Sequence, residues 1–136
     1  MVLELLVTLQ WGVLALGMAV LCYLTAPRIL GVSTRQEIME ESEAGRGNAA
    51  VGIAFFGMYG GLGAILYSSQ ANSDTILQAA AAMVLGYLLM IAGFFLFELI
   101  TPYSLRRQVN DHNVQAGWMV AGLFLLVGLG IAGALV

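Results

Sequence analysis

Four long apolar stretches leave this chain few ways to fold. They run from Leu5 to Ala26, from Ala49 to Ser68, from Ile76 to Ile100 and from Ala116 to Val136, and none contains lysine or arginine. Each stretch can cross the hydrocarbon core of a bilayer, which takes about 20 residues of helix. Because lipid offers backbone groups no partners, we expect all four to be transmembrane helices of an all-α integral membrane protein.

The composition excludes several other classes of protein. Charged residues make up only 10% of the 136 residues, against roughly 25% in a typical soluble domain. The net charge is −3 and lysine is absent, so no nucleic-acid partner is expected. The single cysteine, Cys22, lies in an apolar stretch, which predicts a small buried side chain and excludes a disulfide framework.

The arginines predict the orientation of the chain in the membrane. All five lie in two of the three connections: Arg28, Arg35 and Arg46 in the first, Arg106 and Arg107 in the third. Connections rich in arginine stay in the cytoplasm. We therefore expect a multi-pass protein with both termini on the outer face.

A polar segment followed by spaced glycines opens two of the apolar stretches. GRGNAAVGIAFFGMYGGLGAIL begins at Gly45, and NDHNVQAGWMVAGLFLLVGLGIAGAL begins at Asn110. A shift of 65 positions aligns Asn48 with Asn113, Gly52 with Gly117, Gly57 with Gly122 and Gly63 with Gly128. The preceding stretches correspond at a shift of 76, which aligns Thr25 with Thr101, each followed closely by a proline.

This correspondence predicts one membrane domain, 1–136, made of two tandem helical hairpins. Repeat one covers 1–70, with helices 5–26 and 49–68 and a cytoplasmic helical connection at 33–47, and repeat two covers 71–136, with helices 76–100 and 116–136. Repeats with an even number of spans keep the same orientation. We therefore expect a pseudo-twofold axis along the membrane normal, and chance alignment of two glycine-rich stretches is the alternative.

The same residues resemble a known family. A T-P turn, a short polar connection and then GNAAVGIAFFG or NVQAGWMVAG are similar to the YjfL-like bacterial inner-membrane proteins, domain of unknown function 350. The resemblance runs from about Thr25 to Val136. It implies four helices, a tandem two-helix repeat and residence in the bacterial inner membrane, but no assigned activity. Links of some relatives to envelope-stress or polyamine gene neighbourhoods suggest a role in envelope homeostasis.

Glycines are the first candidates for a functional surface. Seven are expected at a helix-packing or oligomer interface: Gly52, Gly57, Gly61, Gly63, Gly117, Gly122 and Gly128. Small residues let helix backbones approach closely in lipid, where the hydrophobic effect cannot drive association. We favour packing of the second stretch against the fourth within one chain. A homo-oligomer interface is the alternative, and the two can coexist.

Two kinds of polar residue near the membrane surface are further candidates. Asn48 and Asn113 precede apolar stretches, where a side-chain oxygen can cap the first free N–H groups. The alternative is a pair of anion-binding helix ends. Glu98 is the one carboxylate embedded in an apolar stretch. We favour an ion pair with Arg28 or Arg106 over a proton or cation role.

The connection at 33–47 is the candidate for protein binding. Its glutamates, including Glu37, Glu40 and Glu41, would be repelled by an anionic leaflet, so this helix should project from the membrane. It would then offer a docking surface to a cytoplasmic protein partner. The alternative is a solvated polar face without a partner.

No residue pattern indicates an enzyme. The sequence contains no nucleophile–base constellation and no phosphate-binding loop, so we expect no catalytic residue, cofactor or metal site. We expect a non-enzymatic oligomeric scaffold or accessory component embedded in membrane lipid. The alternative is an oligomeric ion channel or small-solute transporter that uses Glu98.

Overall fold

The computed structural model describes residues 1–30, 49–102 and 104–135. This part of the chain contains no strand and five helices: α1 (Val2–Leu30), α2 (Ala49–Asn72), α3 (Ile76–Ile100), α4 (Leu105–Asn110) and α5 (Val114–Ala134). All except the short α4 are long and apolar enough to cross a membrane. The predicted all-α membrane fold with four transmembrane helices is confirmed.

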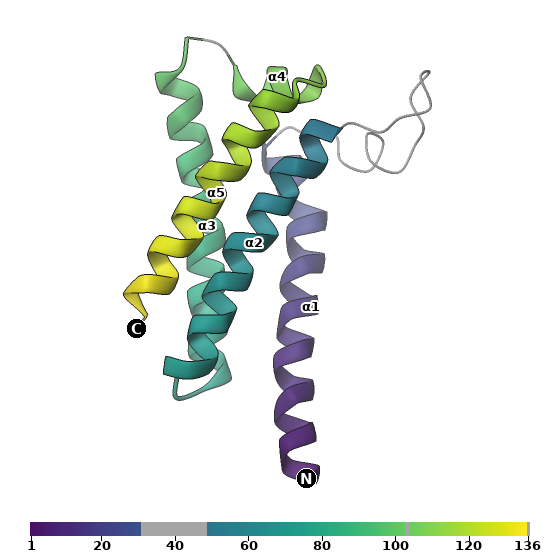
Figure 1. Cartoon of the computed structure of the whole chain (residues 1–136), viewed down its shortest axis with the longest axis vertical. Coiled ribbons are helices and arrows are strands. Elements are labelled where there is room, and N and C mark those ends of the chain that lie inside the picture. The colour runs from purple at the N-terminus through teal and green to yellow at the C-terminus, as the bar shows by residue number, and fades with distance from the viewer. Residues whose placement is uncertain (31–48, 103, 136) are drawn as a thin grey trace.

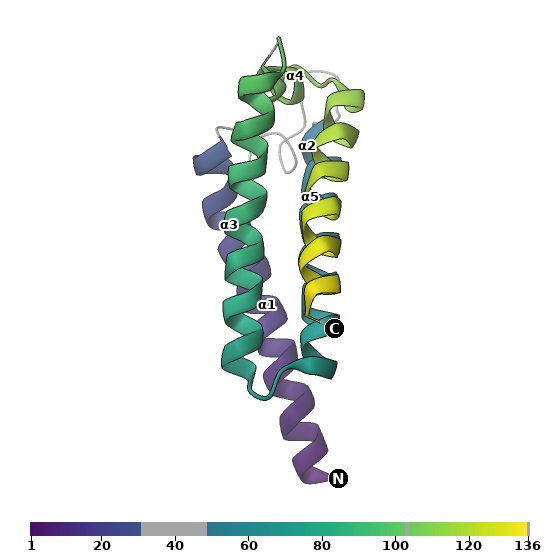
Figure 2. The same ribbon diagram turned by 90° about the vertical axis from the view of Figure 1, so that its left-hand side faces the viewer.

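The four long helices run alternately up and down the bundle (Figure 1). The most extensive contact joins α2 and α5, α3 packs against both of them, and α1 packs mainly against α3. The amino-terminal end of α1 projects beyond the turn between α2 and α3 (Figures 1 and 2). Both termini point toward the end of the bundle that carries this turn, here called the terminal end. The opposite end carries α4 and is called the α4 end.

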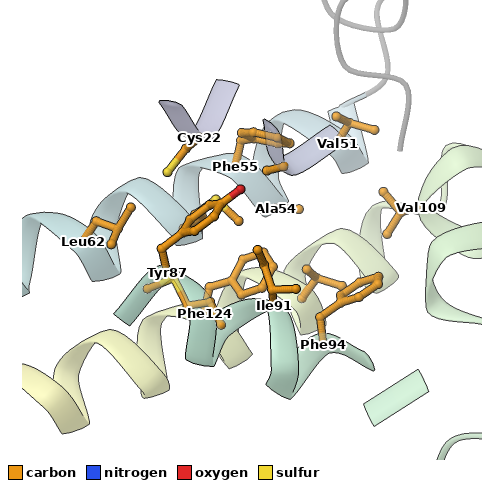
Figure 3. Close-up of a cluster of buried hydrophobic side chains, with 14 of the residues drawn as sticks. Cys22, Val51, Ala54, Phe55, Leu62, Tyr87, Ile91, Phe94, Val109 and Phe124 are labelled. Atoms are coloured by element: carbon orange, nitrogen blue, oxygen red, sulfur yellow. The ribbon is translucent and has the colours of Figure 1, made fainter. Parts of the chain in front are cut away.

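Apolar side chains fill the space between the helices (Figure 3). The largest fully buried side chains are Phe94, Phe124, Met58, Ile65 and Met90. The rings of Phe94 and Phe124 lie with their centroids 6.4 Å apart and link α3 to α5. Large apolar side chains also cover the outside of the bundle, for example Leu16, which is 69% exposed. An outer surface of this kind is typical of a helix bundle that lies in lipid.

Local signals set both ends of α3. Thr75 caps its start, with Oγ1 accepting the N–H of Gln78 at 3.3 Å. At the other end, the N–H of Thr101 donates to the carbonyl of Phe97 at 2.9 Å. Pro102 follows, and a residue before proline is driven out of the helical region. Thr101 accordingly has φ −73° and ψ 142°, so α3 ends where the sequence predicts.

Candidate functional site

Glycines bring the backbones of α2 and α5 into direct contact. A Cβ added to Gly57 would lie 2.6 Å from the Cβ of Ala121, and one added to Gly128 would lie 2.6 Å from the carbonyl carbon of Gly61. Atoms this close would overlap, so the two helices could not keep this distance if either glycine carried a side chain. In lipid such close packing is itself a source of helix association.

The same contact continues toward both ends of the bundle. Near the α4 end, a Cβ on Gly117 would lie 2.6 Å from the carbonyl oxygen of Ala50. Near the terminal end, the hydroxyl of Ser68 donates to the carbonyl oxygen of Ala132 at 2.8 Å, and Ser68 is buried. The contact thus extends over most of the length of both helices.

The other predicted interface glycines face away from this contact. A Cβ at Gly52, Gly63 or Gly122 would meet no atom within 4 Å. In each of the three glycine pairs that the shift of 65 aligns, one member therefore lies between α2 and α5 and the other lies outside this contact. A twofold axis between these helices would bring both members into the contact, so the predicted pseudo-twofold symmetry is not confirmed.

Glu98 lies in a small polar cluster at the α4 end. The hydroxyl of Ser104 donates to Glu98 Oε1 at 2.6 Å, and Arg106 Nε lies 3.8 Å from the same oxygen. Ser104 Oγ also accepts the N–H of Arg107 at 3.3 Å and so caps α4. The side chain of Glu98 is only 17% exposed. The cluster ties the end of α3 to the start of α4.

Sequence reasoning missed both Ser104 and α4. A serine placed directly before LRRQVN is a recognisable N-cap signal. Leu105 and Val109, four residues apart, are both buried, which is the spacing of one helix face. The signal was therefore present, but six residues are too few to stand out beside the long apolar stretches.

Asn113 caps α5 with its side chain. Its Oδ1 accepts the N–H groups of Gln115 at 3.1 Å and of Ala116 at 3.4 Å. Its Nδ2 donates to the side-chain oxygen of Gln108 in α4 at 3.0 Å. Both the oxygen and the nitrogen of the side-chain amide therefore make hydrogen bonds, and the oxygen caps α5.

The backbone of the same turn closes α4. The N–H of Asn113 donates to the carbonyl of Gln108 at 3.0 Å, and the N–H of His112 donates to that of Val109 at 3.2 Å. This pair of bonds is the Schellman arrangement, which needs a left-handed residue after the helix. His112 provides it with φ 66°. The turn therefore ends one helix and starts the next within three residues.

A partly buried polar contact that the sequence did not indicate holds α1 against α3. The hydroxyls of Thr25 and Tyr87 lie 2.6 Å apart, and Tyr87 reaches toward α1 beside Cys22 and Phe55 (Figure 3). The hydroxyl of Tyr59 in α2 adds a long hydrogen bond to the carbonyl of Ala19 at 3.4 Å. Cys22 is fully buried and free, which confirms its predicted role as a small buried residue.

Several predicted site residues lie outside the described part of the chain. They are Asn48, Glu37, Glu40 and Glu41, together with the expected helix at 33–47. Within the described ranges, no group of three or more histidine, cysteine, aspartate or glutamate side chains could hold a metal ion.

The helices and their contacts define a polytopic, all-helical transmembrane protein. The family described as Domain of Unknown Function (DUF350) matches residues 1–135, and the chain belongs to this family. The chain is also similar to the UPF0719 transmembrane protein YshE of Bacillus subtilis (strain 168), with 26% identity over 120 residues that cover 85% of this chain and 88% of that protein. No solved structure matches it. The family resemblance seen in the sequence is confirmed.

Proposed function

We propose that this protein is a non-enzymatic component of the bacterial inner membrane that assembles with copies of itself and serves as a scaffold or accessory protein. One contrast carries the proposal: the interior of the bundle is packed, whereas several glycines on its outside have no neighbour. Apart from tyrosine, the buried polar side chains in the described residues are Ser68 and Ser69. Conduction requires a path lined by polar groups, which this interior does not supply.

The environment of Glu98 supports a structural role over transport. Its carboxylate accepts the Ser104 hydroxyl and lies near Arg106 at the α4 end. An acid that carries protons or cations would instead be expected to face a water-filled cavity. In the proposed orientation the α4 end lies in the cytoplasm, where the connection at 33–47 would meet a protein partner. The extension of this role to envelope homeostasis rests only on the resemblance noted in the sequence, because the family itself has no assigned function.

Native mass spectrometry and liposome flux test this function together. Protein extracted in mild detergent should give a homo-oligomer. Reconstituted liposomes should leak protons and small cations no faster than protein-free liposomes, with or without Glu98→Gln. A flux that depends on pH and falls in Glu98→Gln would instead support the transporter. A purely monomeric protein would contradict self-assembly.

A further inference from the structure

One face of α5 is largely uncovered in the bundle, and so is the face of α2 that lies beside α1. On α5 this face comprises Gly122, Leu126 and Gly130, spaced by four residues, and is called the outer α5 face. On α2 it comprises Gly52, Phe56 and Gly63 and is called the outer α2 face. Leu126 is 71% exposed and Phe56 69%, and a Cβ on any of the four glycines would meet no atom within 4 Å.

The sequence correspondence at a shift of 65 relates both outer faces to the contact between α2 and α5. At the shift of 65, the outer α5 face aligns with Gly57, Gly61 and Ile65, which form the packed face of α2. The outer α2 face aligns with Gly117, Ala121 and Gly128, which form the packed face of α5. Each outer face therefore corresponds, position by position, to a face that packs in the contact between α2 and α5.

Both outer faces are hollowed where these residues lie. The outer α5 face borders an apolar groove of about 430 Å³ between α3 and α5, lined by Gly93, Leu96, Leu126 and Gly130 among others. Gly63 on α2 borders a hollow of about 140 Å³ that it shares with Ala15 of α1. Apolar cavities of about 150 Å³ hold a benzene molecule, so this hollow has room for a large apolar side chain.

We propose, as a refinement of the self-assembly proposed above, that copies of this chain associate head to tail, with the outer α5 face of one copy against the outer α2 face of the next. Each residue of the internal contact can be replaced by the residue that the shift of 65 aligns with it. This places Leu126 beside Gly63 of the next copy and Gly122 beside Phe56 of the next copy. In both pairs a glycine leaves space for a large apolar side chain. This contact continues the α2–α5 interface from one chain to another.

The directions of the helices are compatible with such an assembly. Within the chain α2 and α5 run the same way (Figure 1), so every copy keeps one orientation in the bilayer. A contact between two different faces is heterologous, and it closes into a ring or continues as a filament. Leu126 and Phe56 stand where the internal contact has Gly61 and Ala121. The backbones of neighbouring copies should therefore lie farther apart than those of α2 and α5.

Cysteine cross-linking in native membranes tests the pairing. In a Cys22→Ala background, two differently tagged copies are co-expressed, one with Leu126→Cys and the other with Gly63→Cys. Oxidation should join the two tags, and neither variant alone should cross-link to itself. A chain carrying both substitutions should give a ladder of oligomers. Leu88→Cys, 55% exposed on α3, replaces Leu126→Cys in the matched control and should abolish the ladder.

Other outcomes separate this inference from self-assembly in general. If Gly63→Cys or Leu126→Cys cross-links only to itself, the copies meet through like faces, and the head-to-tail arrangement is overturned while self-assembly stands. If no pair cross-links and the protein is monomeric, lipid covers both faces and both proposals fall. Gly63→Leu is a second variant, which should cause loss of the oligomer in native mass spectra with unchanged helical circular dichroism. An intact oligomer in this variant overturns the pairing.

Discussion

Gly128 lies directly against Gly61, and this pair sets the distance between α5 and α2. A Cβ on Gly128 would lie 2.6 Å from the carbonyl carbon of Gly61, so the helices can lie this close only because Gly128 has no side chain. Lipid tails are as apolar as leucine, so the hydrophobic effect gives no preference for helix contact over lipid contact. Close backbone packing must therefore supply much of the stability of this bundle.

Gly128→Ala should destabilise the protein by about 1–3 kcal/mol, which is the usual cost of overpacking a well-packed core. The atoms nearest the added methyl group are backbone atoms of Gly61, so the helices must separate to admit it. Unfolding in mixed micelles with increasing SDS measures the effect. Gly17→Ala in α1 is the matched control, since a Cβ there meets no atom within 4 Å and Gly17 belongs to neither outer face. An equal loss of unfolding free energy in the two variants would contradict the role of the Gly61–Gly128 contact.

The hydrogen bond between Thr25 and Tyr87 should couple α1 to α3 by about 0.6 kcal/mol and by no more than about 1.7 kcal/mol, the range found for such bonds in membranes. The measurement is a double-mutant cycle with Thr25→Val and Tyr87→Phe, followed by unfolding in mixed micelles. The cycle is needed because Thr25 also donates to the carbonyl of Leu21 at 2.6 Å. If the losses of unfolding free energy in the two single variants add up to the loss in the double variant, the two hydroxyls contribute independently.

Much of the fold follows from the sequence because lipid sets simple rules. An apolar stretch of bilayer length is expected to be a helix, and the bounds of α3 match the prediction at both ends. Glycines at close spacing indicate that backbones touch. Asn113 stands where an N-cap is needed, and it occupies that place in the structure.

What the sequence could not show is which face of each helix packs inward. In a soluble protein, polar residues mark the outer face, but here both faces of α2 and α5 are apolar. Gly57 and Gly122 occupy corresponding positions in two similar stretches of sequence. Yet Gly57 lies against Ala121, whereas a Cβ on Gly122 would meet no atom within 4 Å. The Thr25–Tyr87 pair was equally hidden, because it joins residues from separate helices that nothing in the sequence links.

Replacing Asn113 should loosen the start of α5. Asn113→Ala removes the oxygen that accepts from Gln115 and Ala116, and loss of an N-cap costs about 1 kcal/mol. Asn113→Asp keeps an acceptor oxygen and adds a negative charge that suits a helix N-terminus, so it should retain most of the stability. Hydrogen exchange at the amides of Gln115 and Ala116 should be faster in Asn113→Ala alone. Similar exchange in both variants would argue against capping.

The ion pair between Glu98 and Arg106 should contribute modestly and depend on salt. Arg106 is 46% exposed, and pairs of this kind are worth about 1 kcal/mol or less. Glu98→Gln preserves an acceptor for Ser104 and removes only the charge. Its difference in unfolding free energy from the wild type should shrink at about 1 M salt, where the Debye length is about 3 Å. Arg106→Gln should behave the same way. If the difference in unfolding free energy does not change with salt concentration, the contribution is not electrostatic.

The α4 end should face the cytoplasm, because Arg28, Arg106 and Arg107 gather there and arginine-rich ends are retained inside. In a Cys22→Ala background, Asp74→Cys at the terminal end and His112→Cys at the α4 end report on the two sides, since both positions are exposed. A membrane-impermeant thiol reagent added to intact cells should label only Asp74→Cys. Permeabilised cells provide the control and should allow both to react. Labelling of His112→Cys alone in intact cells would reverse the orientation and place any docking surface at the α4 end outside the cytoplasm.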